Sequence, residues 1–152
     1  MADPVPMRIL QDLETTLGLP DGGSSYFFDI QKVLIPGLNE FEILEFPGIA
    51  IIPEGTVDDD TELLSEQTTR WNILLIAALN VRTDADDQIL KLIADVFKAL
   101  MIDPQRGGNA IDTKWRGWTP AAPSDDADMM TWAEIRIQVH FRTSDTDMTV
   151  SR

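Results

Sequence analysis

Three clusters of carboxylates and a single histidine are the side chains of this sequence with the clearest capacity for chemistry. The carboxylates lie at residues 58–60, 84–87 and 125–128, and the histidine is His140. Clustered carboxylates could hold a hard cation such as Ca²⁺ or Mg²⁺, or serve as the acid and base of a glycosidase. A histidine could act as a general base if a nucleophile and a carboxylate converged on it.

None of these residues falls into a motif that performs such chemistry. The cluster at Asp84 does not match an EF-hand loop, because Ile89 would take the place of the turn glycine and Asp95 that of the bidentate glutamate. No Gly-x-Ser-x-Gly sequence is present to place a nucleophile near His140. One histidine without any cysteine makes a zinc site improbable. We therefore expect no enzymatic activity and no bound metal or cofactor. The carboxylates are expected to cap a helix or to lie in solvent-exposed loops.

The charge balance is the strongest compositional signal. The 152 residues include 26 acidic and 12 basic side chains, for a formal net charge of −14. Such a surface repels phosphate backbones, so it disfavours a protein that grips DNA, although DNA could still slide past it. The length suits one domain with one core. The longest apolar stretch, residues 73–79, is too short to span a bilayer and no signal-peptide pattern precedes it, so we expect cytosolic synthesis.

Two segments have the periodicity of helices that bury one face. Residues 4–17 form the first, with apolar side chains on one stripe and prolines tolerated in the first turn. Residues 84–101 form the second, with Thr83 or Asp84 as its cap. The apolar face of this second helix comprises Ile89, Leu92, Ile93, Val96, Phe97 and Leu100.

Alternating or continuous apolar runs predict the strands, which are residues 26–35, 46–53, 71–79, 110–119 and 133–142. The run at 46–53 has a proline near each end, so this strand should begin and end abruptly. The run at 71–79 is apolar on both faces, which is typical of a central strand covered on both sides. Apolar and polar residues alternate strictly along the last strand, so we expect one of its faces to be buried in the core and the other to be exposed to solvent.

The chain therefore reads as one α+β domain spanning residues 1–152. We expect a mixed or antiparallel sheet packed against two helices in the order α-β-β-β-α-β-β, with both helices on one side. The acidic segment 54–66 has almost no apolar anchors and is expected to be a mobile loop. The polar tail 144–152 is expected to fray when the subunit is alone.

Trp115 and Trp118, with Lys114 and Arg116 beside them, could stack the bases of a single strand. In a regular strand, however, the two indoles point to opposite faces and cannot form one platform. We therefore expect one tryptophan in the core and the other as an interface anchor.

The order of the elements, together with local patterns, resembles the tail terminator family of long-tailed phages, whose members are similar to minor tail protein U. The patterns are the strands at 47–52 and 70–79, the helix at 84–101, the turn at 107–109, and the alternating ending 135–143, which closes on Phe-Arg-Thr. The length of the acidic segment and the Trp115–Trp118 pair depart from the family pattern.

The resemblance implies a structural virion protein without catalysis. It would form a homo-oligomeric ring, a hexamer in the family, that caps the tail tube, stops its polymerisation and offers a surface to the head connector. DNA would pass through without specific binding, and no membrane would be involved. The protein would be made in the host cytoplasm and end at the head-proximal end of the tail. The candidate interaction residues are Asp58, Asp59, Asp60, Trp115, Trp118, His140 and Arg142.

Two other classes of protein remain open from the sequence. The first is another neck or tail-completion subunit of the same assembly, which only its position in a virion would distinguish. The second is a small acidic binding or inhibitor domain that works as a monomer. The mass of the particle in solution separates this second class from a ring-forming subunit.

Overall fold

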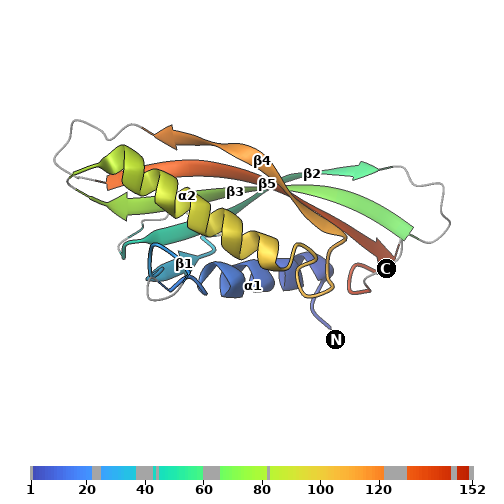
Figure 1. Cartoon of the computed structure of the whole chain (residues 1–152). Helices are drawn as coiled ribbons and strands as arrows, with labels where there is room; N and C mark the ends of the chain where they lie inside the picture. The colour runs from blue at the N-terminus through green and yellow to red at the C-terminus, as the bar shows by residue number, and fades with distance from the viewer. Residues whose placement is uncertain are drawn as a thin grey trace.

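The computed structural model describes residues 2–21, 25–36, 43, 45–59, 66–81, 83–121, 130–144 and 147–150. Within these residues the chain follows the order α-β-β-β-α-β-β, which confirms the α+β fold (Figure 1). The helices are α1 (Val5–Leu17) and α2 (Ala85–Ile102), and the strands are β1 (Lys32–Leu34), β2 (Gly48–Asp59), β3 (Glu66–Asn80), β4 (Asp112–Ala121) and β5 (Met130–Ser144).

The five strands form one sheet in the order β1-β2-β3-β5-β4. β1 pairs with β2 in parallel, and the other neighbours are antiparallel. β3 and β5 are each 15 residues long and pair along their whole length. They form the centre of the sheet, and the short β1 and the bulged β4 are its edges.

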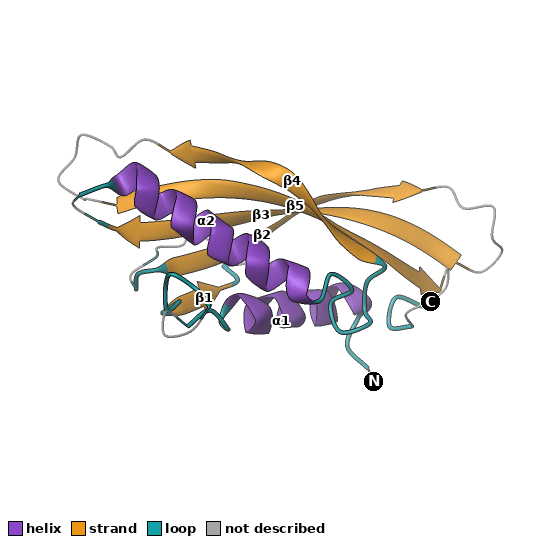
Figure 2. Cartoon of the chain, in the orientation of Figure 1, coloured by secondary structure: helices purple, strands orange, loops and turns teal. Residues whose placement is uncertain are grey.

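Both helices lie on the same side of the sheet (Figure 2), as the sequence predicts. Each helix repeats apolar residues at helical spacing and turns this stripe towards the strands. The buried stripe of α1 is Val5, Ile9, Leu13 and Leu17, and that of α2 includes Ile89, Leu92, Val96 and Leu100. These residues form the main core with alternate residues of the central strands, among them Ile73, Leu75, Ile135, Ile137 and Val139.

β2 does not end at Pro53, as the sequence pattern suggested, but continues to Asp59. Its pairing with β3 shifts register between Pro53 and Thr56, and β1 pairs with β2 only as far as Ala50. Pro53 therefore lies where β2 has a single neighbour and a bulge, positions at which a missing backbone N–H is tolerated. The boundaries expected for the acidic loop 54–66 were wrong, since 54–59 and Glu66 belong to strands; residues 60–65 lie outside the described residues.

Only Lys32–Leu34 of the expected strand at 26–35 pairs with a neighbour. The preceding segment bonds instead to side chains of α2. The backbone N–H groups of Phe27 and Phe28 donate to the carboxylate of Asp95 at 3.0 and 2.9 Å, and Lys98 Nζ donates to the carbonyl of Ser25 at 2.8 Å. Asp95 is only 2 % exposed, so this carboxylate replaces a strand partner for the segment.

α2 begins at the predicted place without the predicted side-chain cap. Asp84 is the N-cap residue, but it adopts a left-handed conformation with φ of 54° and its side chain makes no capping hydrogen bond. Asp86 and Asp87 occupy the first turn, where negative charge favours the positive end of the helix dipole.

The described part of the C-terminal tail, residues 147–150, is folded against α1. The N–H of Val5 donates to the carbonyl of Met148 at 2.8 Å, and Arg8 Nη2 donates to that of Thr149 at 2.6 Å. The N–H of Ser144 donates to the carbonyl of Val150 at 3.1 Å. These residues thus supply acceptors to the open N-terminal turn of α1, whereas the fraying expected of the tail in the free subunit stays a prediction.

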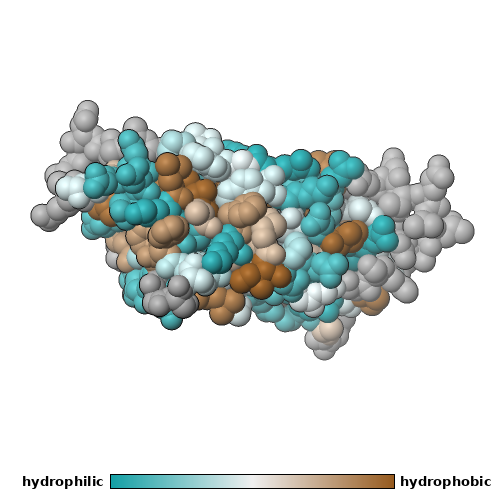
Figure 3. All heavy atoms as spheres, in the orientation of Figure 1, coloured by the Kyte–Doolittle hydropathy of each residue, from teal (hydrophilic) through white to brown (hydrophobic). Residues whose placement is uncertain are grey.

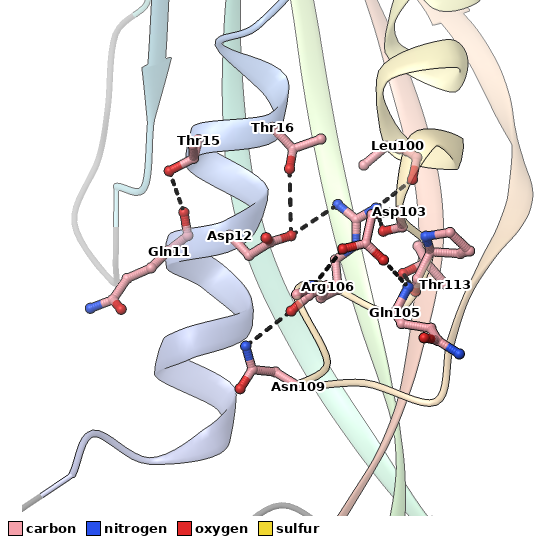
Figure 4. Close-up of polar contacts among 12 residues, drawn as sticks. Gln11, Asp12, Thr15, Thr16, Leu100, Asp103, Gln105, Arg106, Asn109 and Thr113 are labelled. Atoms are coloured by element: carbon pink, nitrogen blue, oxygen red, sulfur yellow. Dashed lines mark hydrogen bonds and ion pairs between the residues drawn. The ribbon is translucent and has the colours of Figure 1, made fainter.

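A buried arginine joins the two helices to the turn before β4 (Figure 4). Arg106 is 0 % exposed, and its Nη2 donates to the carbonyls of Leu100 and Asp103 at the end of α2. Its Nη1 lies 3.3 Å from Asp12 Oδ2 on α1. Burial lowers the pKa of Arg106 and raises that of Asp12, so desolvation outweighs their mutual attraction. The cost of burying both charges therefore offsets much of the attraction in the ion pair, and we expect the bonds to the helix-end carbonyls to be the larger contribution.

We expect Arg106→Met to lower the free energy of unfolding by roughly 3 kcal/mol, because it leaves two carbonyls at the end of α2 without their donor. Asp12→Asn should cost about 1 kcal/mol, because Asp12 is half-buried and its amide can still accept from Thr16. Urea unfolding of both variants measures this difference. Equal losses would show that the ion pair, and not the carbonyl bonds, carries the stability.

Candidate interaction surface

The side of the sheet away from the helices is only partly covered by the residues that the structure describes. Alternation along β3 places Ile73, Leu75 and Ala77 in the main core and turns the residues between them to the other side. We call this other side the open face. At one end, Ile43 and Phe46 pack on Ala50 and Ala78 in a second, smaller core. The expectation of a central strand covered on both sides therefore holds only at that end.

Around the small core, the open face is apolar and half-buried, and Ile76, Met130 and Trp132 pack against that core. Its residues are Ile52 of β2, Leu74 and Ile76 of β3, and Met130 and Trp132 of β5. Half-buried apolar side chains on neighbouring strands form a contiguous patch, because paired residues point to the same side. Such a patch is a typical contact surface for another protein.

The other half of the open face is polar and joined across three strands. Gln138 on β5 is at its centre. Its Oε1 accepts from Arg116 Nη2 of β4 at 2.8 Å and lies 2.8 Å from His140 Nε2, while its Nε2 donates to Asn72 Oδ1 of β3 at 3.0 Å. If His140 Nε2 carries the proton, every donor in this hydrogen-bond network faces an acceptor. The network fixes the side chains of β3, β4 and β5 relative to one another.

Positive charge surrounds His140. Burial lowers its pKa first, and the nearby cations Lys114, Arg70 and Arg116 lower it further, with only Asp112 acting in the opposite direction. Arg136, further along β5, is 3.2 Å from Glu54 Oε1 and 3.5 Å from Glu134 Oε2, so its charge is balanced. The excess of positive charge on the open face is therefore centred on His140.

The two tryptophans lie on the same side of the sheet, so the expectation of opposite faces was wrong. Trp115 pairs with Ile137 and Trp118 with Ile135, both residues of the main core side, because the register of β4 shifts between them. Gly117, with φ of 106°, lies in this bulge, and the inserted residue reverses the alternation. Trp115 packs edge-on against Phe97 of α2 with ring centroids 5.0 Å apart, and Trp118 remains 42 % exposed.

The tryptophans are thus on the helix side and form no platform with the open face. Figure 3 shows this helix side, where hydrophobic patches are separated by hydrophilic residues. Exposed Leu90 and Phe97 of α2 belong to it. Lys114 and Arg116 lie on the opposite side from Trp115, so the base-stacking arrangement that the sequence allowed is not formed.

Of the other predicted interaction residues, the structure brings His140 and Arg142 together on the open face, two positions apart on β5. The backbone of Asp58 and Asp59 belongs to β2, their side chains are not described, and Asp60 lies outside the described residues. The sequence analysis missed Arg70, Asn72 and Gln138 as members of the polar network. The alternation of β5 could have identified Gln138 as a residue of its polar face. Nothing in the sequence, however, indicates that Gln138 contacts a residue of β3.

The described residues contain no metal-binding group and no membrane-spanning helix. No three or more His, Cys, Asp or Glu side chains among them lie close enough to hold a metal ion. Neither helix of that part of the chain is both long and apolar enough to cross a membrane. The sequence matches no protein-family model and no curated protein.

The chain has one histidine, so its imidazole signals in proton NMR need no assignment. We expect His140 to titrate below its ordinary pKa of 6.5. Lys114→Gln with Arg116→Gln should raise the midpoint, but only partly, because burial is the larger cause. Protonation of His140 then favours the unfolded chain, so its contribution to stability is lost as the pH falls through 6.5 towards the folded-state pKa. A midpoint at or above 6.5, or one unchanged in the double variant, would contradict this electrostatic environment.

Proposed function

We propose that this chain is a structural assembly subunit that associates head to tail into a ring, acting as a tail terminator at the head-proximal end of a phage tail. The observation that carries the proposal is the open face, whose apolar half is only partly buried by the described residues of a single copy. Apolar surface of this kind is stabilised by a neighbouring subunit. A contact between different surfaces of successive copies closes into a ring when the rotation fits.

The fold order adds support through the resemblance to the tail terminator family. In that family a hexameric ring contacts the tail tube protein on one side and the head connector on the other. The net charge of −14 suits a channel past which DNA moves without binding, since phosphate groups are repelled by it. Another neck or tail-completion subunit would use the same open face, and its position in a virion would tell the two apart.

The proposal assigns no catalytic step. The ring of His140 bonds to Gln138, a side chain that is neither a nucleophile nor an acid. Three cations surround it, which disfavours the imidazolium that a general base must become. We attribute to His140 a place in the polar network and not in a reaction.

We expect the wild-type protein to form a discrete oligomer in sedimentation velocity, with six subunits if the family resemblance holds. The oligomer should be favoured by added salt, because ions screen the repulsion between subunits of like net charge. Negative-stain microscopy should show rings. A protein that stays monomeric at high concentration and at every salt level would rule out the ring and favour the small acidic binding domain.

Leu74→Glu on the open face should weaken this association by about a hundredfold or more, since a carboxylate would be buried in an apolar contact. Leu19→Glu is the control, because Leu19 is an apolar residue 57 % exposed in the loop after α1, outside the strands and the helices. Thermal unfolding of both variants verifies that each subunit still folds. Equal weakening by the two variants would show that the open face has no special role in the contact.

A further inference from the structure

Among the described side chains of the open face, cations outnumber carboxylates, in a protein that is strongly acidic as a whole. The chain has 12 Lys and Arg residues against 26 Asp and Glu residues. Five of these cations are on the open face of three adjacent strands, namely Arg70, Lys114, Arg116, Arg136 and Arg142. The rest of the surface is consequently more negative than the net charge alone suggests.

We define the cationic cluster as Arg70, Lys114, Arg116 and His140, which lie together where β3, β5 and β4 run side by side. Arg70 pairs with His140 across β3 and β5, and Lys114 pairs with Gln138 across β5 and β4. The guanidinium of Arg116 donates to a neutral amide oxygen, which leaves its charge uncompensated. Lys114 Nζ has no hydrogen bond or ion pair in the described part of the chain.

The carboxylates described on the open face are already engaged. Glu54 and Glu134 pair with Arg136, and Asp112 accepts a hydrogen bond from the N–H of Thr113 at 2.9 Å. Exposed carboxylates lie instead on the helices, at Glu14 of α1 and at Asp86 and Asp87 of α2. Among the side chains that the structure describes, the exposed carboxylates of the helices could therefore complement the cluster, and Asp112 is the one carboxylate beside the cluster.

We propose that the cationic cluster binds carboxylates on the helix side of a second copy of this chain. The inference rests on the proposed self-association and specifies which two surfaces meet. The open face of one subunit contacts the acidic helix side of the next. Two open faces packed against each other would leave the cluster without carboxylates to bind. Because successive contacts use different surfaces, the charge distribution favours a ring or filament over a two-fold dimer.

A second copy is favoured over nucleic acid as the occupant. A phosphate backbone approaching the cluster also meets the field of a protein of net charge −14, which opposes its binding. A second copy brings the same net charge, but it can present several carboxylates beside apolar surface that covers Leu74 and Ile76. Apolar burial and local ion pairing then act in one contact.

The test compares two single variants that change the net charge equally. Lys114→Gln removes one charge of the cluster, and Lys32→Gln removes one exposed charge from β1, at the opposite edge of the sheet. Sedimentation velocity at moderate salt, with thermal unfolding as a check on folding, should show association weakened about fivefold by the cluster variant and less than about twofold by the control. Anisotropy of a fluorescein-labelled DNA duplex, titrated with the wild type and the cluster variant, tests the competing occupant.

Each outcome decides one claim. A wild type that associates, a cluster variant that does so more weakly and a control that is unaffected would support the inference. Equal effects of the two variants would attribute the change to general repulsion and overturn the inference, leaving the proposed ring intact. Duplex binding that depends on the cluster would assign it to phosphate groups and also overturn the inference. A wild type that is monomeric under all conditions would overturn the proposed function itself.

Discussion

The uninterrupted pairing of β3 with β5 determines the arrangement of the rest of the structure. The two strands face each other from Glu66 opposite Ser144 to Asn80 opposite Met130 without a bulge. Because side chains alternate, a slip of one residue would move every core side chain to the other face. In the observed register one side is apolar along its middle, with buried threonines at its ends, and takes both helices. The other side changes from apolar to polar along its length. The open face and its two halves therefore follow from this register.

The outer strands adapt to this rigid pair through bulges. β2 shifts register between Pro53 and Thr56, and β4 shifts between Trp115 and Trp118. In β2 the shift follows Pro53, which has no backbone N–H to donate to the ladder. In β4 the bulge turns Trp118 to the same side as Trp115, and it separates the tryptophans from Lys114 and Arg116. The open face is consequently free of large aromatic residues on β4 and is dominated there by charge.

The sequence predicts those parts of the fold that depend on local periodicity. The helix at 84–101 and the alternating ending 133–142 were correct because one buried face imposes a regular spacing. The bulges, the two backbone bonds to Asp95 and the burial of Arg106 were missed, because each depends on partners distant in the sequence. A Gly-Gly turn after an arginine gives no sign that its guanidinium caps α2. The same limit applies to the open face: β5 marked His140 and Arg142, but only strand order places Arg70 and Lys114 beside them.

The edges of the sheet explain why association is expected through a face. Free strand edges can pair with other chains, and proteins block them with short strands, bulges, proline and charge. β1 has only three paired residues, and β4 combines a bulge at Gly117 with Pro120 and the charged Lys114 and Arg116. Neither edge offers a long, regular row of backbone groups to a second copy. In the proposed assembly, the half-buried apolar residues of the open face would supply the larger driving force, and the cationic cluster beside them would select which surface of the next subunit fits.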